Sequence, residues 1–261
     1  MHPGAWLAWT MSAGMVAISA TNPFYLLPLF ACAWIVHALK QAPGAGARSF
    51  KAFVIFGLVA IVTRTALVLL GPVTRAAVVA AALEGLRLAV LLAVYGAFNS
   101  VADPTRVLRL APRRFYEPAL AAALALSIAP RTIAAAGRVR EAQKLRGLDT
   151  TRWRGLVALA VPVLETGMEQ AVTLAESMDA RGHGRGRRSH YRPERFGLWA
   201  WLTVGLAAAA LSVFLFATRT GDPSLTMPAF PLAWPHANPV LVAAILLFAL
   251  PAFMADEAGA R

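Results

Sequence analysis

Two short phrases in the basic middle of the chain have the residue types and the spacing of a repeated contact site. The first reads Glu141-Ala-Gln-Lys-Leu-Arg146-Gly147 and the second reads Glu176-Ser-Met-Asp-Ala-Arg181-Gly182, with a spacing of 35 residues between the two arginines. An arginine guanidinium is always charged and presents five donors in a rigid fork. An arginine held at an exposed position can therefore bind carboxylates and carbonyl groups of a partner protein.

A plainer explanation exists for one such phrase. Each phrase closes a segment with a helical pattern, and a glycine just past the last helical residue adopts the left-handed conformation at little cost. An arginine in the last turn also interacts well with the negative end of the helix dipole. Because the phrase occurs twice, each time with a glutamate five residues before the arginine, we predict two matched contact tips. Their residues are Arg146, Gly147, Ala180, Arg181 and Gly182, supported by Pro130, Glu141 and Glu176 on the helices behind them.

Three further charged residues lie in segments that are otherwise apolar. Arg64 lies 7 residues before Gly71 of the Gly71-Pro72 turn, and Glu84 lies 8 residues after Ala76, where the next segment begins; Arg87 follows three residues later. Antiparallel neighbours would place Arg64 and Glu84 at similar depth, and Arg87 shares a helix face with Glu84. Charges inside a membrane are costly and usually pair. We predict an ion pair of Glu84 with Arg64 or Arg87 that orients two helices, with an ion or substrate pathway as the alternative.

The sequence offers little for catalysis, metal binding or redox chemistry. Its three lysines, Lys40, Lys51 and Lys144, do not follow a glycine, which excludes a phosphate-binding loop of the Gly-x-x-x-x-Gly-Lys-Ser/Thr type. His183 and His190 lack a convincing set of partner ligands for a metal. The single cysteine, Cys32, lies in an apolar run and is expected to pack in the core. We predict no catalytic residue, no metal site and no cofactor bound by this chain, so it is not expected to be an enzyme.

Composition and charge distribution indicate a polytopic membrane protein. The chain has 261 residues, of which 58% are hydrophobic, a mean hydropathy of +0.59 and a formal net charge of +12. Of 25 lysines and arginines, 17 lie between Asn99 and Arg195, and long apolar runs flank that block on both sides. This is the distribution of the positive-inside rule, and nucleic-acid binding proteins do not carry such runs.

Six apolar segments are predicted to be transmembrane helices. We therefore expect a protein of the cell membrane with both termini in the cytoplasm. They cover residues 5–20, 24–39, 52–71, 76–98, 197–218 and 239–254. Thr21-Asn22-Pro23 divides the first two into a helical hairpin. Aromatic residues near the ends of these segments are candidates either for interfacial anchors or for simple lipid-facing or core positions: Trp6, Trp9, Tyr25 and Trp34. The fold class is therefore all-α, with about six spans.

The basic block between the fourth and fifth spans is predicted to lie in the cytoplasm. It comprises a short Arg-rich surface helix over 104–114, long helices over 116–145 and 155–181, and a basic loop over 183–195. Asp103 would cap the surface helix, and Pro130 is expected to kink the first long helix. The second is amphipathic, because apolar residues from Leu164 to Met178 recur at spacings of three and four. The chain thus divides into 1–103, 104–196 and 197–261.

With these features in place, the chain resembles the transmembrane T component of energy-coupling factor (ECF) transporters, the CbiQ-type family. The resemblance covers most of the chain, and its most specific part is the pair of Arg-Gly phrases. The matching features are His2-Pro3, Asn22-Pro23, Glu84-Gly85-Leu86-Arg87, Asp103-Pro104, Pro130 before the first Arg-Gly, and Ala180-Arg181-Gly182. The first phrase departs from the family's Ala-Arg-Gly motif, because Leu145 stands in the alanine position.

The resemblance implies a role and a set of partners. In that family the two motifs are the tips of coupling helices and dock on a pair of ABC-type ATPases, which bind ATP and Mg²⁺. The same scaffold holds a small substrate-binding membrane subunit that captures a vitamin or a metal ion such as cobalt. The sequence itself keeps one alternative open, a stand-alone secondary transporter that uses Arg64, Glu84 and Arg87. A membrane enzyme acting on lipid would need a cluster of His, Asp, Glu or Cys at the membrane surface, which the sequence does not offer.

Overall fold

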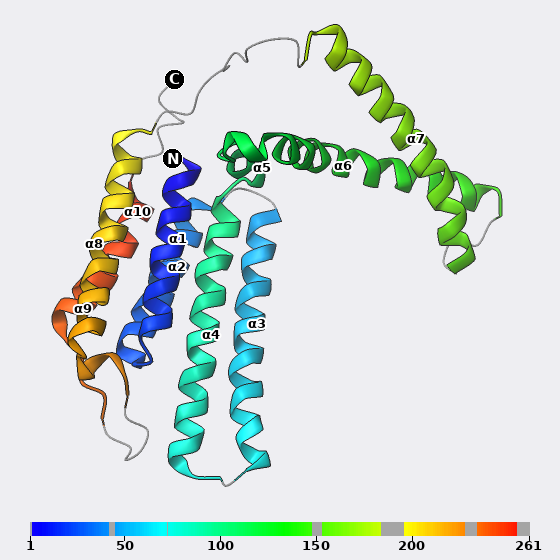
Figure 1. Ribbon diagram of the computed structural model, residues 1–261. Coiled ribbons are helices and arrows are strands. Elements are labelled where there is room, and N and C mark those ends of the chain that lie inside the picture. The colour runs from blue at the N-terminus through cyan, green and yellow to red at the C-terminus, as the bar shows by residue number, and fades with distance from the viewer. Residues whose placement is uncertain are drawn as a thin grey trace. The chain divides into compact units, whose positions relative to one another are not determined.

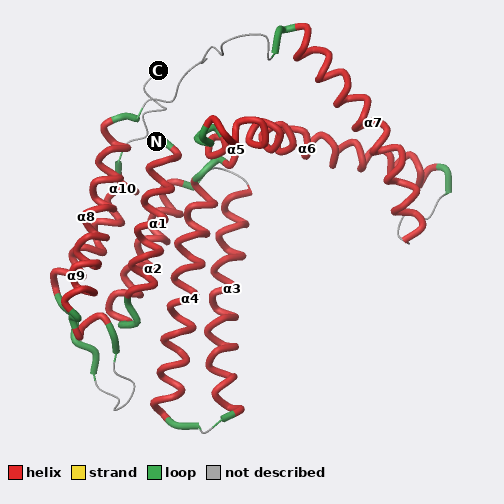
Figure 2. The backbone as a smooth tube through the Cα atoms, viewed as in Figure 1, coloured by secondary structure: helices red, strands yellow, loops and turns green. Residues whose placement is uncertain are grey.

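A computed structural model describes residues 2–41, 45–71, 73–147, 153–183, 196–227 and 234–254. All regular secondary structure in these ranges is helical, as Figure 2 shows. The helices are α1 Pro3–Ser19, α2 Pro23–Lys40, α3 Ala45–Leu67, α4 Arg75–Val101, α5 Pro104–Leu108, α6 Tyr116–Leu145, α7 Trp153–Ala180, α8 Leu198–Thr220, α9 Pro239–Leu246 and α10 Leu250–Phe253. Short 3₁₀ turns cover Val68–Leu70, Arg113–Phe115, Pro223–Leu225 and Leu247–Ala249. The predicted all-α class is confirmed.

Five helices in the described ranges are long and apolar enough to cross a membrane. They are α2, α3 from Arg48 onward, α4, α6 and α8. The predicted first and last spans also form helices, but α1 has only 17 residues and the last is the shorter segment Pro239–Phe253. We expected α6 to start against the membrane and to end in water. By length and hydropathy it is nevertheless one of the five helices that could cross a membrane. The chain is a multi-pass membrane protein.

The chain divides into two compact units. The first unit comprises residues 1–107 and 194–261, and the second comprises residues 108–193 (Figure 1). The outer segments of the sequence, although separated by the basic block, therefore fold together. The basic loop predicted over 183–195 lies outside the described residues except for His183, and so do Pro72 and residues 42–44 of the expected loops.

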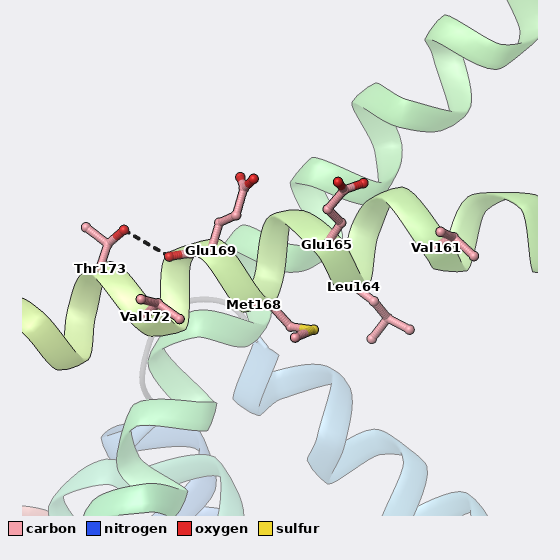
Figure 3. A pocket seen from close by; sticks show the side chains of 7 residues that line it. All are labelled: Val161, Leu164, Glu165, Met168, Glu169, Val172 and Thr173. Atoms are coloured by element: carbon pink, nitrogen blue, oxygen red, sulfur yellow. Dashed lines mark hydrogen bonds between the residues drawn. The ribbon is translucent and has the colours of Figure 1, made fainter.

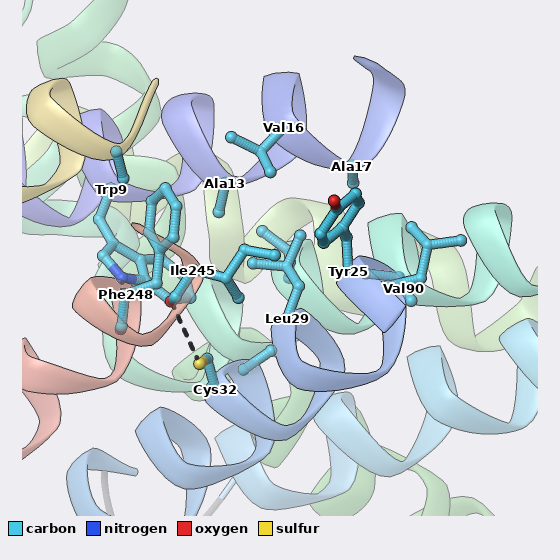
Figure 4. Packing of buried hydrophobic residues seen from close by; sticks show 14 of the residues in the cluster. Trp9, Ala13, Val16, Ala17, Tyr25, Leu29, Cys32, Val90, Ile245 and Phe248 are labelled. Atoms are coloured by element: carbon cyan, nitrogen blue, oxygen red, sulfur yellow. Dashed lines mark hydrogen bonds between the residues drawn. The ribbon is translucent and has the colours of Figure 1, made fainter. Parts of the chain in front are cut away.

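The core of the first unit is built from apolar side chains of α1, α2, α4, α8 and the C-terminal helices (Figure 4). Trp9 is fully buried, and its indole N–H donates a hydrogen bond to the carbonyl oxygen of Phe248 at 3.0 Å. Trp6 and Tyr25 are also buried, whereas Trp34 is 49% exposed. Three of the four aromatic residues therefore occupy core positions, and Trp34 is exposed, as either an interfacial anchor or a lipid-facing residue would be.

Asn22 fixes the α1–α2 turn to a distant part of the chain. Its side-chain oxygen accepts the N–H of Phe24 at 3.0 Å and so caps α2, as a turn asparagine before a proline would. Its amide group donates to the carbonyl oxygens of Ser224 at 2.7 Å and His236 at 2.9 Å. The described part of the loop after α8 therefore packs against the α1–α2 turn.

The helices α3 and α4 form a close antiparallel hairpin. A Cβ atom added to Gly85 would lie 2.6 Å from the Cα atom of Ile61, and one added to Gly57 would lie 2.9 Å from the Cα atom of Ala89. Small residues allow this backbone approach, which is a common basis of helix packing in membranes. These two glycines therefore set the distance between the helices that carry Arg64 and Glu84.

The predicted surface helix over 104–114 is shorter than expected. The α-helix ends at Leu108, and Pro112 prevents its continuation to 114, because proline disfavours helical geometry in the residue before it and has no N–H to donate. Asp103 acts as the expected cap: its carboxylate accepts the N–H of Thr105 at 2.8 Å and the hydroxyl of Thr105 at 2.7 Å. The hydrogen bond from the Thr105 hydroxyl lowers the pKa of the Asp103 carboxyl.

Candidate functional site

The end of α6 carries the first of the two predicted tips. Leu145 is the last helical residue, Arg146 is the cap and Gly147 has a φ of 78°. The N–H of Gly147 donates to the carbonyl oxygen of Lys144 at 3.0 Å, and the N–H of Arg146 donates to that of Ala142 at 3.2 Å. Glycine is needed here because the left-handed region is costly for a residue with a side chain. The helix therefore ends at a position defined by the sequence, and Arg146 lies in its final turn.

The end of α7 carries the second tip with the same backbone geometry. Ala180 is the last helical residue and Gly182 has a φ of 74°. The N–H of Gly182 donates to the carbonyl oxygen of Asp179 at 2.8 Å, and the N–H of His183 donates to that of Met178 at 3.0 Å. These two bonds form a Schellman motif, in which an otherwise unsatisfied carbonyl at the helix end is paired. Both glycines thus serve the helix-stop role that the sequence predicts.

The arginines at the two tips are exposed and available to a partner. Arg146 and Arg181 both lie at the surface, and neither guanidinium has a hydrogen bond or ion pair with another residue in the described ranges. Glu141 and Glu176, each five residues earlier, are exposed on the same helices, as is Pro130, which lies inside the continuous helix α6. The helices α6 and α7 contact each other, and their two tips lie apart within the second unit (Figure 1).

A third helix end shows which feature of the tips is general and which is particular. Gly221 at the end of α8 has a φ of 67°, and the N–H of Asp222 donates to the carbonyl oxygen of Ala217 at 3.0 Å. The left-handed glycine is therefore an ordinary helix stop in this protein. The nearest arginine, Arg219, is two residues before Gly221 instead of directly before it. The arginine placed directly before the glycine is what distinguishes the tips of α6 and α7.

The helix α7 also exposes an apolar face in the described structure. Leu164 is 65% exposed and Met168 is 69% exposed, and in Figure 3 both side chains point away from Glu165 and Glu169 on the same helix. The predicted amphipathic pattern is therefore visible in the folded helix. Together with the tips, it gives the second unit a charged end and an apolar flank that other protein surfaces can contact.

The three membrane charges lie together in the first unit. An Arg64 guanidinium nitrogen is 3.7 Å from one carboxylate oxygen of Glu84, and an Arg87 nitrogen is 3.6 Å from the other. Arg87 also donates to the carbonyl oxygen of Ile18, near the end of α1. Arg64 and Glu84 are about half exposed in the isolated chain, whereas Arg87 is 24% exposed. The cluster connects three helices, because α4 contributes Glu84 and Arg87, α3 contributes Arg64 and α1 contributes the Ile18 carbonyl.

Within the described ranges, no group of three or more His, Cys, Asp or Glu side chains lies close enough to hold a metal ion. His190, which the sequence raised as a weak metal candidate, lies outside those ranges. The cysteine Cys32 is buried in the core of the first unit, as expected. Contacts that the sequence did not indicate include those of Asn22 with Ser224 and His236 and the bond from Arg87 to Ile18, which join residues far apart in the chain.

Comparison with known proteins finds similarity to a transporter component. The chain is 30% identical over 164 residues to the energy-coupling factor transporter transmembrane protein EcfT of Thermanaerovibrio acidaminovorans, a match that covers 56% of this chain and 61% of that protein. It is also 32% identical over 110 residues to an uncharacterized protein of Mycoplasma genitalium, covering 40% of this chain and 26% of that protein. No family model matches the chain. The first of these matches confirms the resemblance to ECF T components that the motifs indicate, and the chain spans less than two thirds of either relative.

Proposed function

We propose that this chain is the membrane scaffold and energy-coupling subunit of an ECF-type ATP-driven importer. In this proposal two ABC-type ATPases bind ATP and Mg²⁺ and dock on the tips of α6 and α7. Their closure is transmitted to a small membrane subunit that captures a vitamin or a metal ion such as cobalt. The chain itself is non-catalytic and lies in the cell membrane with both termini in the cytoplasm.

One observation carries the proposal: two exposed arginines, each placed directly before a left-handed glycine at the end of a long helix. Gly147 and Gly182 have φ values of 78° and 74°, so the backbone presents Arg146 and Arg181 in the same way. A guanidinium at such an end can bind several acidic or carbonyl groups of a partner at once. The similarity to an EcfT protein supports the assignment of the partners.

The helices behind the tips are suited to transmit a displacement. The helix α6 has 30 residues and α7 has 28, and both stay helical through an internal proline. A helix rises about 1.5 Å per residue, so each reaches about 40 Å from its tip. Because α6 and α7 contact each other, a movement imposed at one tip changes the packing of the pair. Binding of ATP by the partners would thus displace the apolar parts of both helices.

The stand-alone secondary transporter is less well supported. Transporters of that class often bind their substrates where membrane helices are interrupted. Here Arg64, Glu84 and Arg87 lie within the regular helices α3 and α4, and both arginines face the same carboxylate. This arrangement favours an ion pair that holds helices together over a group that must release a bound ion in each cycle.

The proposal is tested by removing both guanidinium groups. In the Arg146→Ala/Arg181→Ala protein, uptake of the cognate vitamin or metal ion should be lost and co-purification of the ATPases should fall. Truncating one partner of a buried charge pair costs about 2–5 kcal/mol, which corresponds to more than a tenfold loss in affinity. Arg→Lys at either tip should restore only part of the function, since an ammonium group cannot replace the planar fork.

The matched control is Arg219→Ala at the third glycine-stopped helix end, which should leave both measurements unchanged. The substrate-binding subunit should still co-purify with the double variant, because its contacts lie elsewhere in this proposal. Full recovery of the ATPases together with uptake at the level of the unmodified protein would reduce the two arginines to ordinary helix-stop residues and would remove the main support for this function.

A further inference from the structure

The charged cluster of α1, α3 and α4 has a positive charge that the chain does not balance. Two guanidinium groups, Arg64 and Arg87, face one carboxylate, Glu84, which gives the cluster a net charge of +1. Glu84 is the only acidic residue among the first 102 residues of the sequence. The carboxylate of Asp222 is hydrogen-bonded within the segment between α8 and α9. The described part of the first unit therefore supplies this cluster with a single countercharge.

The guanidinium of Arg64 forms no hydrogen bond with another residue in the described ranges. One of its nitrogens is 3.7 Å from a Glu84 oxygen, whereas charge-assisted hydrogen bonds measure about 2.7–2.9 Å. Arg87 differs, because it donates to the carbonyl oxygen of Ile18 and is the less exposed of the two arginines. Five N–H donors without acceptors are costly beside hydrocarbon. Arg64 is thus the member of the cluster that is best placed to bind an anion from outside the chain.

The cluster lies near the ends of two membrane helices. Ile18 is one residue from the end of α1, and Arg64 is in the last turn of α3. Long basic side chains at such positions extend toward the polar surface of the bilayer, where the phosphates of the lipids lie. The anion that the membrane itself offers at this depth is the phosphate of a lipid headgroup.

An apolar surface continues from the cluster along α1 and α4, and we call it the α1/α4 strip. Its exposed side chains are Met11, Met15, Ile18, Leu88 and Tyr95. The two helices lie side by side, and a Cβ atom added to Gly14 of α1 would be 3.5 Å from the hydroxyl of Tyr95 (Figure 1). Tyr95 follows Glu84 by 11 residues, or about 16 Å along α4. Lipid tails that start at the cluster therefore meet an apolar surface on both helices.

We propose that Arg64, with Arg87 beside it, binds the phosphate of an anionic phospholipid whose acyl chains lie along the α1/α4 strip. The lipid supplies the missing negative charge, and the planar guanidinium group can bind two phosphate oxygens at once. A zwitterionic lipid brings its own cation and adds no net charge, so an anionic headgroup is preferred. The inference does not depend on the proposed function, because it uses only residues of the first unit.

Lipid binding to the purified full-length chain tests this site. The chain in detergent is titrated with phosphatidylglycerol or phosphatidylcholine, and native mass spectrometry counts the bound lipids. We expect one phosphatidylglycerol per chain, bound about tenfold more tightly than phosphatidylcholine, because only the former adds a net negative charge. Arg64→Gln should abolish this preference. The pair of Glu84 and Arg87 remains in that variant and keeps the helices together.

The matched control for Arg64→Gln is Arg75→Gln, which should keep the preference for phosphatidylglycerol. Arg75 is exposed at the start of α4, nine residues before Glu84. That separation is about 13 Å along the helix, beyond the screening length of about 8 Å at physiological ionic strength.

A second test supplies the missing charge from within the chain and leaves both arginines in place. Leu67 is exposed three residues after Arg64, a spacing at which two side chains of a helix are neighbours. Leu67→Glu should weaken the binding of phosphatidylglycerol by about tenfold, because the carboxylate competes with the lipid phosphate for Arg64. Leu67→Gln is the matched control, since it is equally polar but uncharged, and it should bind the lipid as the unmodified chain does.

Three results would overturn the proposal. The first is equal binding of the two lipids by the unmodified chain, or a preference that survives Arg64→Gln. The second is displacement of phosphatidylglycerol by inorganic phosphate at the same concentration, which would assign the site to a free anion. The third is an intact complex that carries no phosphatidylglycerol and loses a membrane subunit on Arg64→Gln, because the countercharge would then be a carboxylate of that partner.

Discussion

At the scale of single residues, arginine side chains lie in two different environments in this protein. Arg146 and Arg181 lie exposed at helix ends, where their charge is available to a partner. Arg64 and Arg87 instead face Glu84 within the apolar helices α3 and α4. We therefore propose that arginine is a contact group in the first setting and a structural group in the second, and substitutions should distinguish the two roles.

Replacing Glu84 with glutamine should reduce the amount of folded protein more than it changes transport. The amide would leave two guanidinium groups without a countercharge in the apolar part of the chain, and such charges are costly there. The yield of monodisperse protein in detergent measures the effect, with Glu169→Gln on the exposed face of α7 as the control. Normal assembly of the Glu84→Gln protein together with a specific loss of uptake would instead support a pathway role for these charges.

Replacing Gly182 with alanine should destabilise the end of α7. The position has a φ of 74° and open space around it, so the cost is conformational rather than steric, at about 1–2 kcal/mol. Amide hydrogen exchange of the last turn of α7 should become faster.

The matched control for Gly182→Ala is Gly167→Ala in the interior of α7, which also has open space around it but no positive φ. That change should stabilise the helix by about 1 kcal/mol, because alanine is the better helix former. Slower exchange in both variants would mean that the left-handed glycine does not define the tip.

At the scale of elements, the α3–α4 hairpin depends on close contact between two backbones. Gly85→Ala would place a Cβ atom 2.6 Å from the Cα atom of Ile61, which the facing helix can accommodate only by moving. Overpacking of this kind costs about 1–3 kcal/mol, so the purified protein should unfold at a lower temperature. Gly205→Ala in α8, where nothing lies within 4 Å, is the matched control and should not lower the melting temperature, because alanine is the better helix former. Equal melting temperatures for the two variants would argue against close α3–α4 contact in the membrane.

At the scale of the whole molecule, the distribution of charge predicts the orientation in the membrane. The basic residues between Asn99 and Arg195 should lie on the cytoplasmic side. Cysteines introduced at Arg106 or Arg109 should react with a membrane-impermeant maleimide only when the cytoplasmic face is accessible. The native Cys32 is buried, and a buried thiol reacts poorly with a maleimide. It should therefore contribute little background labelling. Labelling of intact cells from outside would reverse the proposed topology.

The sequence by itself determined the features that depend on neighbours a few residues away. The all-α class, the helices at the six apolar segments, the asparagine cap of α2 and the two glycine stops all follow from local rules of hydropathy and helix termination. The pairing of Arg64 with Glu84 could be anticipated as well, because a short turn fixes the register of two consecutive helices. One local expectation was wrong: the helix after Asp103 ends at Leu108 instead of 114.

Only the tertiary structure decided the contacts between distant segments. It placed Trp6, Trp9 and Tyr25 in the core instead of at the membrane interface, and it joined Asn22 to Ser224 and His236 across about 200 residues of chain. It also showed that Leu145 is exposed at the end of α6. Hydropathy does not distinguish an apolar side chain that packs on a neighbouring helix from one that faces lipid or a partner. That distinction depends on which helices meet, and here the segments that meet come from opposite ends of the sequence.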